Sequence, residues 1–260
     1  MSDRKDRMPV IFVGHGSPMN AIQDNPYTKS WKKVGKDIPK PKAILAVSAH
    51  WYTNGSRISD IEQPKLVYDM YGFPNELYQV KYPVSGDSRI AHRVQELTDK
   101  KAAIDNSWGI DHGIWSVLCN MFPKADIPVI ELSVDRTADA KSHFKLGQDI
   151  STIRDEGILI LASGNVVHNL VMADYNMEDR GYQWAEEFDA YIKEKILQKE
   201  FEDVIHYKSA GENSVLAFQT PDHFYPLLYA LGAVSSSDKV SVFNESCTLG
   251  ALSMTSYLFG

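Results

Sequence analysis

The sequence predicts an α/β protein, a single domain with a mostly parallel central sheet flanked by helices. Several short segments are apolar throughout rather than alternating, which is typical of strands covered on both faces. Helical patterns separate these segments, and strands that alternate with helices form βαβ units. The 260 residues contain no internal repeat and no long linker. We therefore expect one domain over residues 1–260, with residues 1–8 as a flexible N-terminus.

The expected core strands are the segments that are apolar throughout. They lie at residues 10–13, 43–47, 129–132 and 158–162. Two later segments, residues 240–243 and 251–257, are expected to close the sheet. Four apolar segments of this length supply the centre of a parallel sheet, and the last two supply its edge.

Helical patterns fill the intervals between the expected strands. Asn25 and Pro26 indicate a helix start, because Asn is a favoured N-cap and Pro fits the first turn. The other expected helices are amphipathic or apolar and lie at residues 88–100, 138–156 and 183–199, with one more after residue 223. These helices would cover both faces of the sheet.

Composition and charge exclude several classes of partner. The formal net charge is -7, and an acidic balance disfavours nucleic acid, whose phosphates need clustered Lys and Arg. The charged N-terminus lacks a signal-peptide segment, and no apolar run approaches the ~20 residues that cross a bilayer. The two cysteines, Cys119 and Cys247, form no disulfide framework. We expect a cytoplasmic protein, a monomer or small homo-oligomer, that binds neither nucleic acid nor membrane.

Three of the eight histidines directly follow expected core strands. They are His15, His50 and His168. If the strands are parallel, all three emerge at the carboxyl edge of the sheet, where open α/β sheets bind ligands. A lone histidine after a strand is more often an ordinary polar residue. Three in equivalent positions indicate a metal site, because His is the commonest metal ligand.

Two further histidines have alternative interpretations. His112 follows Asp111 in a loop that opens a helix. Asp111 would either cap that helix or fix the tautomer of an acid–base histidine. His223 follows Asp222, and either Asp222 or Thr220 could cap the next helix. His223 would otherwise be a ligand or a base, and the sequence leaves both cases open.

The remaining histidines carry no chemical signal. His92, His143 and His206 stand in helical or linker patterns beside charged residues, and we expect surface or packing roles. The chain contains no HExxH, no GxSxG elbow and no phosphate-binding GxxxxGK[ST] motif. These absences give no support to a serine hydrolase or a nucleotide hydrolase.

Five motifs in this order resemble the class III extradiol ring-cleavage dioxygenases, the superfamily of protocatechuate 4,5-dioxygenase. They are GHGSP, SAHW, GIDHGIW, SGNVVHN and PDHFYPLLYALGA. The match is nearest to the 4,5-DOPA extradiol dioxygenase branch and runs from Pro9 to the C-terminus. The resemblance implies a single catalytic domain that opens a catechol such as DOPA with O2. It also implies one divalent metal ion, Fe2+ or Zn2+.

The resemblance also implies roles for the histidines. His15, His50 and His223 match the metal ligands, with His168 close enough to be a fourth. His112 and His168 match the non-ligand histidines that move protons, so His168 is expected to change between the two roles. The side chains expected to support the ligands or bind substrate are Ser17, Asp111, Asn169 and Asp222.

One departure bears on the metal. Protocatechuate-type enzymes hold iron with two histidines and a glutamate, whereas no Glu stands beside His223 in this chain. A histidine-rich site suits Zn2+, which has no redox chemistry of its own. Two other functions therefore remain in view, a zinc-dependent hydrolase and a non-catalytic metal-binding protein on the same scaffold.

Overall fold

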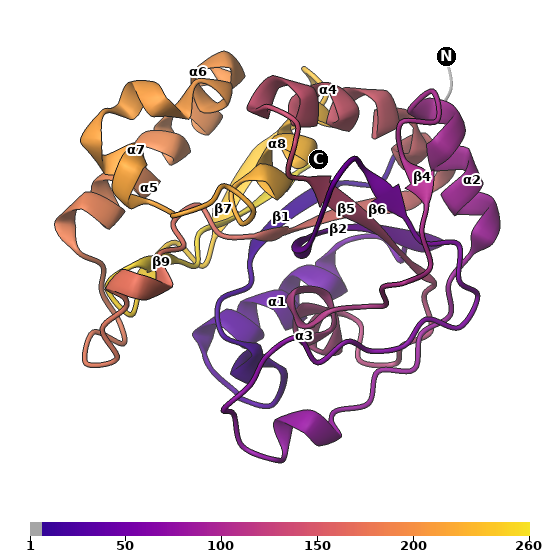
Figure 1. The fold of residues 1–260 in the computed structure, drawn as a ribbon, viewed down its shortest axis with the longest axis horizontal. Helices are drawn as coiled ribbons and strands as arrows, with labels where there is room; N and C mark the ends of the chain where they lie inside the picture. Colours follow the sequence, from indigo (N-terminus) through magenta and orange to yellow (C-terminus); the bar gives the residue numbers. More distant parts are fainter. Residues whose placement is uncertain (1–6) are drawn as a thin grey trace.

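The computed structural model describes residues 7–260 and has an eight-stranded sheet at its centre (Figure 1). Its strand order is β4-β3-β5-β2-β6-β1-β10-β7. The four central strands are β1 (Val10–Gly14), β2 (Ala43–Thr53), β5 (Val129–Asp135) and β6 (Ile158–Gly164). β6 pairs in parallel with β1 and with β2, and β2 pairs in parallel with β5. The predicted fold class is confirmed.

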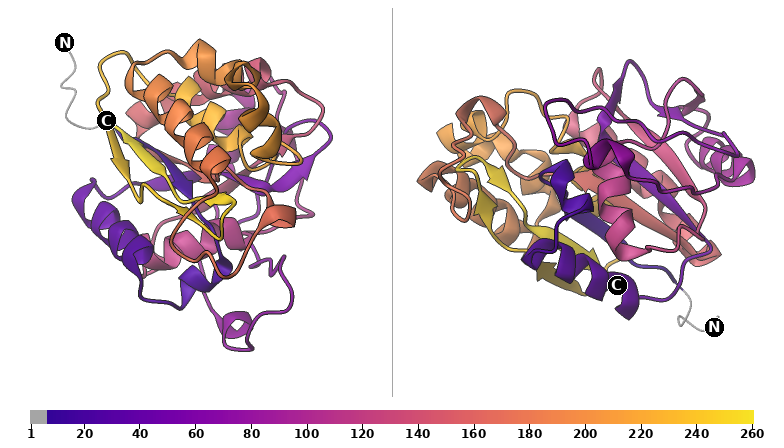
Figure 2. Two further views of the ribbon diagram at one scale, coloured as in Figure 1. Left: turned by 90° about the vertical axis from the view of Figure 1, so that its left-hand side faces the viewer. Right: turned by 90° about the horizontal axis from the view of Figure 1, so that it is seen from below.

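Shorter strands complete the sheet on both sides. They are β3 (Arg57–Ile58), β4 (Ala103–Ile104), β7 (Val240–Phe243) and β10 (Ser256–Phe259). β10 runs antiparallel to β1 and to β7, and β3 runs antiparallel to β5. Residues 240–243 therefore form the predicted strand, and Figure 2 shows the C-terminal strands in yellow at one edge of the molecule.

The predicted strand at residues 251–257 is wrong as a single element. β9 (Leu252–Ser253) pairs with β8 (Cys247–Thr248) in a separate small sheet. The carboxylate of Asp189 accepts hydrogen bonds from the hydroxyls of Ser253 at 2.5 Å and Thr255 at 2.7 Å. These bonds hold the segment against α5 before β10 begins.

Helices cover both faces of the sheet. They are α1 (Pro26–Asp37), α2 (Ser88–Leu97), α3 (His112–Met121), α4 (Ala140–Ile150), α5 (Gln183–Leu197), α6 (Phe201–Ile205), α7 (Glu212–Leu216) and α8 (Tyr225–Gly232). Short 3-10 helices occur at Pro18–Ala21, Leu77–Gln79, Ser151–Glu156, Leu170–Met172 and Tyr207–Ala210. α1 and α3 lie on one face, and α4 and α8 lie on the other (Figure 1). α5, α6 and α7 form a group beside α8, which faces the viewer in the left panel of Figure 2.

Local signals explain where two helices begin. Asn25 caps the start of α1, as the sequence predicted, and it forms a capping box with Thr28. The expected helix at residues 138–156 begins only at Ala140, because the Asp139 side chain caps it by accepting from Ser142 N at 2.9 Å. Beyond Ile150 it continues as a 3-10 helix, and the left-handed Gly157 (φ 87°) ends it.

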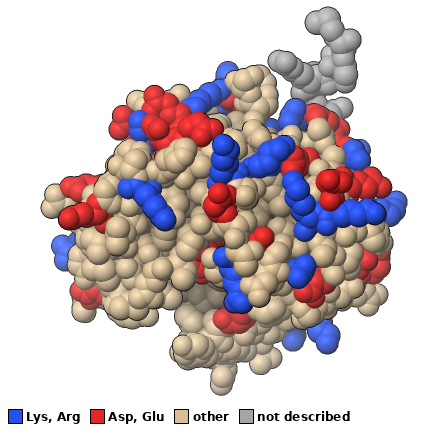
Figure 3. Space-filling view, turned by 45° about the horizontal axis from the view of Figure 1, so that its top comes forward, with Lys and Arg blue, Asp and Glu red and all other residues tan. Residues whose placement is uncertain are grey.

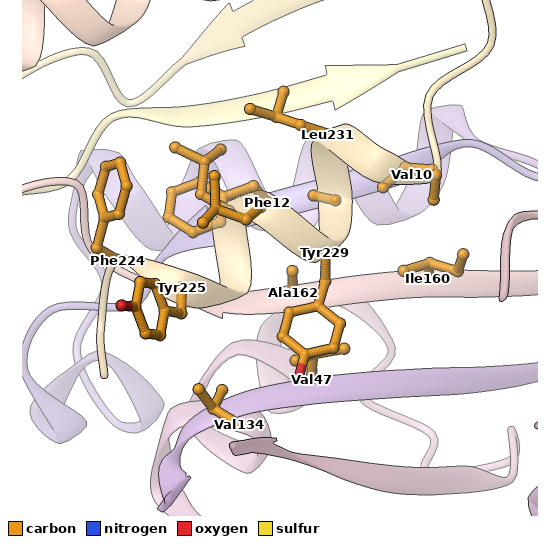
Figure 4. Packing of buried hydrophobic residues seen from close by; sticks show 14 of the residues in the cluster. Val10, Phe12, Val47, Val134, Ile160, Ala162, Phe224, Tyr225, Tyr229 and Leu231 are labelled. Carbon is orange, nitrogen blue, oxygen red and sulfur yellow. The ribbon is translucent and has the colours of Figure 1, made fainter. Parts of the chain in front are cut away.

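The core has two layers because the central strands are apolar on both faces. In β1, Val10 and Phe12 pack with α8, and Ile11 and Val13 pack on the face of α1 and α3. Figure 4 shows the first layer, where the side chains of α8 lie over those of the strands. Burial on both faces explains why the strand segments are continuous apolar runs.

The prediction of a flexible N-terminus falls mostly outside the described residues, which begin at Arg7. Met8 contradicts its last part, since Met8 is buried and its N–H donates to Arg154 O at 3.0 Å. Within residues 7–260, no helix is long and apolar enough to cross a membrane. Basic and acidic side chains intermingle over the upper part of the face in Figure 3.

Candidate metal centre and active site

Five histidines from five different elements meet at one edge of the sheet. His15 follows β1, His50 lies in β2, His112 begins α3, His168 follows β6 and His223 precedes α8. The ring centroid of His50 is 4.8 Å from that of His15, 4.1 Å from that of His112 and 5.0 Å from that of His223. The structure thus brings together every histidine that the sequence analysis singled out.

His15 is held in one tautomer by the end of β6. Its Nδ1 lies 2.9 Å from the Ser163 hydroxyl, and that hydroxyl donates to Gly113 O at 2.6 Å. The Ser163 oxygen must therefore accept from His15 Nδ1–H, which leaves the lone pair on Nε2. Burial, and then the neighbouring His50, hold the pKa of His15 well below its usual value. Neutral His15 is in the form that binds a metal.

His50 lies inside β2 rather than after it, because β2 continues to Thr53. The register of β2 against β5 shifts between Ser48 and Tyr52. His50 Nδ1 lies 2.9 Å from Asp69 Oδ2 and 3.5 Å from Asp111 Oδ1. Burial opposes a charge on His50, but the two carboxylates outweigh burial and raise the pKa of His50 to about 10.

His223 is supported by its own neighbour in the sequence. Its Nδ1 lies 3.0 Å from Asp222 Oδ2. α8 has no side-chain cap, and Thr220 Oγ1 donates to Asp222 Oδ1 at 2.7 Å. Of the two alternatives that the sequence left open, the cap by Thr220 or Asp222 is not the one found, because the Asp222 carboxylate is directed to His223.

The backbone of His223 is fixed to the end of β6. Its carbonyl oxygen accepts from Asn165 N at 2.9 Å. A Cβ on Gly164 would stand 2.1 Å from the same oxygen. Only glycine permits this close approach of the two segments.

The donor atoms fit a divalent metal ion. His50 Nε2 and His223 Nε2 are 3.1 Å apart, while both Nδ1 atoms face carboxylates. Two nitrogens bound to one ion at ~2.0–2.1 Å stand about 2.9–3.4 Å apart for angles between square and tetrahedral. Ligand atoms of His15, His50 and His112 also lie within 4.8 Å of one another. The carboxylate-backed Nδ1 atoms match the support that metal-ligating histidines usually receive.

His168 stacks on His223 instead of standing beside it. The ring centroids are 3.5 Å apart, and the planes differ by 4°. An imidazole nitrogen binds a metal in its ring plane, and two parallel planes do not share one ion. The expected four-histidine set is therefore not formed in this arrangement. Burial lowers the pKa of His168 to about 4, so that the ring is neutral at pH 7.

His112 is oriented by Asp69, and Asp111 takes the other of the two roles that the sequence left open for it. Asp69 Oδ1 lies 2.8 Å from His112 Nδ1 and accepts from His112 N at 3.0 Å. Asp111 instead caps α3 by accepting from Gly113 N at 3.0 Å. Sequence reasoning missed Asp69, which lies in the irregular segment between β3 and α2. The available signal was the length of that segment, since loops this long are often functional.

A second missed carboxyl group lies behind Asp111. Glu131 on β5 is 1% exposed, and its Oε2 accepts from Asp111 N at 3.4 Å. Burial, and then the charge of Asp111, raise the pKa of Glu131 well above its usual value. Glu131 thus lies behind Asp111 in surroundings that disfavour its charged form.

Two residues that were expected to support the ligands or bind substrate form no side-chain hydrogen bond to a histidine side chain within residues 7–260. Ser17 Oγ accepts from Met19 N at 3.2 Å, and Asn169 Nδ2 donates to Leu216 O at 2.8 Å. Both side chains stabilise the loops beside His15 and His168.

The other three histidines lie apart from the cluster. His143 is buried against tyrosines of α8, and the side chains of His92 and His206 are exposed, as expected.

Comparison with known proteins identifies the class. A family profile described as "Catalytic LigB subunit of aromatic ring-opening dioxygenase" matches residues 8–260. A protein of Escherichia coli K12 named "4,5-DOPA dioxygenase extradiol" is 42% identical, over 98% of this chain and 95% of its own. A protein of Beta vulgaris with the same name is 37% identical, over 96% of each chain.

A solved structure agrees with these matches. A protein of Escherichia coli K12, described as uncharacterized, superposes with a TM-score of 0.86 at 39% identity over 98% of this chain and all of its own. The fold and the site thus define an extradiol ring-cleavage dioxygenase. The chain belongs to the LigB family of catalytic subunits of aromatic ring-opening dioxygenases.

Proposed function

We propose that the chain opens the ring of a catechol such as DOPA with O2, and that it does so with one divalent metal ion. His15, His50 and His223 would hold that ion. The observation that carries this proposal is the 3.1 Å contact between His50 Nε2 and His223 Nε2, whose Nδ1 atoms both face carboxylates. The substrate follows from the printed names of the relatives, which are DOPA dioxygenases.

The metal and the protein divide the chemistry between them. When bound, a redox-active ion such as Fe2+ acidifies the catechol hydroxyls and supplies the electron transfer to O2 that Zn2+ lacks. Asp69 and Asp222 face the Nδ1 atoms of His50 and His223, so that each Nε2 is directed inward, and His50 would lose its Nε2 proton on binding the ion.

His168 is suited to take a proton from the catechol. Burial keeps it neutral at pH 7, with a pKa of about 4. Its ring is held by stacking on His223, and its backbone N–H donates to Ala217 O at 2.8 Å. A neutral imidazole beside the ligands accepts a proton as the substrate binds.

His112 is suited to return a proton. Burial, and then the charge of His50, lower its pKa, and Asp69 takes its Nδ1–H at 2.8 Å. Its Nε2 is therefore the atom that exchanges protons with substrate. Because His112 is neutral, it must first take up a proton at Nε2, such as one released by the substrate, before it can return that proton to the opened ring.

The carboxylates argue against the hydrolase alternative. A hydrolase that uses a carboxylate to activate its metal-bound water needs that carboxylate free, whereas Asp69, Asp111 and Asp222 all lie within 3.5 Å of a histidine nitrogen.

The test is anaerobic loading with Fe2+, followed by DOPA and air-saturated buffer. We expect a yellow ring-opened semialdehyde and consumption of one O2 per product. The chain loaded with Zn2+ alone should bind catechol without turnover. Failure of the Fe2+-loaded chain to open any catechol, with the metal shown to be bound, would contradict the proposal.

A further inference from the structure

Asp69 is the only carboxylate among those at the cluster, within the described chain, that contacts two of the five histidines through separate oxygens. Its Oδ2 lies 2.9 Å from His50 Nδ1. Its Oδ1 lies 2.8 Å from His112 Nδ1 and accepts from His112 N at 3.0 Å. One side chain therefore lies against the Nδ1 atoms of an expected metal ligand and of an expected proton donor.

The segment before Asp69 is fixed against the start of α3. Val67 N donates to Ile110 O at 2.8 Å, and Ile110 N donates to Lys65 O at 2.8 Å. Trp115 Nε1 donates to Val67 O at 2.9 Å. These bonds hold Asp69 in register with His112 over a large separation in sequence, and its side chain is 14% exposed.

The two histidines impose a requirement that only a carboxylate meets. The Nδ1 atoms of the two histidines lie 2.9 Å and 2.8 Å from different oxygens of Asp69, and an N–H on each requires that both oxygens can accept. An amide has one acceptor oxygen and one donor nitrogen. The side chain of Asp222, by contrast, faces a single histidine, and its other oxygen accepts from the Thr220 hydroxyl, which can also accept.

We propose that Asp69 is a positioning residue that sets the tautomers of His50 and His112 together, and thereby couples metal binding to proton transfer in this site. The metal half of this inference rests on the proposed function, and the His112 half does not. Nothing is transferred to Asp69 itself, because its carboxylate accepts hydrogen bonds in every state.

The Asp69→Asn variant separates the two halves. The single amide oxygen should turn to His112, which offers two N–H donors, and the amide NH2 should then face His50 Nδ1. That arrangement favours a proton on His50 Nε2, the atom that would bind the metal. We expect the Kd for Zn2+ to rise by roughly 10–100-fold, the usual cost of losing such support. The matched Asp222→Asn variant removes the same charge and should raise the Kd for Zn2+ less than tenfold.

The second readout is the tautomer of His112, measured by 15N–1H NMR in the full chain after chelation of metal. Wild type and Asp69→Asn should both carry the proton on Nδ1 of His112. Asp69→Ala should lose this preference and shift His112 toward the Nε2–H form, whereas Asp222→Asn should leave it unchanged. Circular dichroism reports whether each variant folds, and Asp69→Leu, which also lacks an acceptor, replaces Asp69→Ala for this readout if Asp69→Ala does not fold.

The outcomes are distinct. Unchanged Zn2+ affinity in Asp69→Asn would overturn the proposal. It would indicate that Asp111, whose Oδ1 lies 3.5 Å from His50 Nδ1, sets the tautomer of His50 instead. A His112 tautomer indifferent to Asp69→Ala would overturn it as well. If wild type binds no Zn2+, the proposed function and the metal half both fail, and the His112 signal still decides the other half.

Discussion

The two sides of the histidine cluster are built in different ways. On one side, His223 and its carboxylate, Asp222, are neighbours in the chain, and the close approach at Gly164 fixes the backbone. On the other side, His50 and His112 share Asp69, which comes from a distant irregular segment. A carboxylate that orients a neighbouring histidine can be recognised in one short sequence motif. A carboxylate shared by two distant histidines depends on the tertiary structure.

The largest effect is expected from removing a ligand common to both sides. His50 Nε2 contacts His223, and His50 Nδ1 contacts Asp69. We expect His50→Ala to abolish stoichiometric metal binding and all ring opening, with the fold retained. Metal analysis of the purified variant beside wild type measures this. Full occupancy in the variant would show that His50 is not a ligand.

Loss of His112 should affect chemistry without affecting metal content. It stands on the Asp69 side and is assigned to proton transfer rather than ligation. His112→Ala should lower kcat by roughly 10²–10⁴-fold, the range for general acid–base groups. Steady-state kinetics on DOPA with parallel metal analysis provide the measurement. A variant that loses its metal would make His112 a ligand, in line with its position near His15 and His50.

The local side should be the more sensitive to backbone crowding. A Cβ on Gly164 would stand 2.1 Å from His223 O, so that the backbone must move in Gly164→Ala. We expect roughly 1–3 kcal/mol of lost stability, as for other overpacked sites, together with weaker metal binding. Gly72→Ala is a useful control for the added methyl group, since nothing lies within 4 Å of it, although its positive φ adds some strain. Equal losses of metal binding in the two variants would contradict the account.

The smallest effect concerns the buried Asp189 behind the local side. The hydroxyl of Ser253 donates to Asp189, and the backbone carbonyl of Ser253 accepts from Asn165 Nδ2 at 2.7 Å. Burial raises the pKa of Asp189 to about 6, against the hydrogen bonds from Ser253 and Thr255. Because the folded pKa lies above the unfolded value, its contribution is fully present below about pH 4 and is lost as pH rises through 6.

The variant Asp189→Asn isolates this contribution from that of His15, His112 and His168, whose lowered pKa values give stability the opposite pH dependence in the acid range. The Tm of Asp189→Asn relative to wild type should rise between pH 4 and pH 8, by the equivalent of roughly 2–3 kcal/mol. Thermal unfolding at several pH values measures it. A difference in Tm that does not vary with pH would show that Asp189 does not titrate in this range.

The sequence predicted those parts of the site that depend on regular structure. His15, His50 and His168 were expected at one edge because parallel strands place their carboxyl ends together. The stacking of His168 on His223 was not predictable, since it depends on how the loop after β6 meets the segment before α8. Nor was the role of Asp69, because no periodic pattern specifies which residue of an irregular segment reaches the site.

The same distinction applies to the fold. The strand at Val240–Phe243 was predicted to its ends, because the apolar pattern decides it. The segment before β10 was not, because the buried Asp189 carboxylate captures Ser253 and Thr255 from another part of the chain. Tertiary hydrogen bonds thus overrode the local strand preference there.

The most direct test of the central claim is a crystal structure of the full chain with Zn2+ or Fe2+ bound, located by anomalous scattering. The account predicts one ion at ~2.0–2.1 Å from Nε2 of His15, His50 and His223, in the range of Zn–N bonds, with His168 beyond 3 Å and still stacked on His223. An ion held by His112 or by the carboxylate of Asp69, or no ion at these histidines, would contradict it.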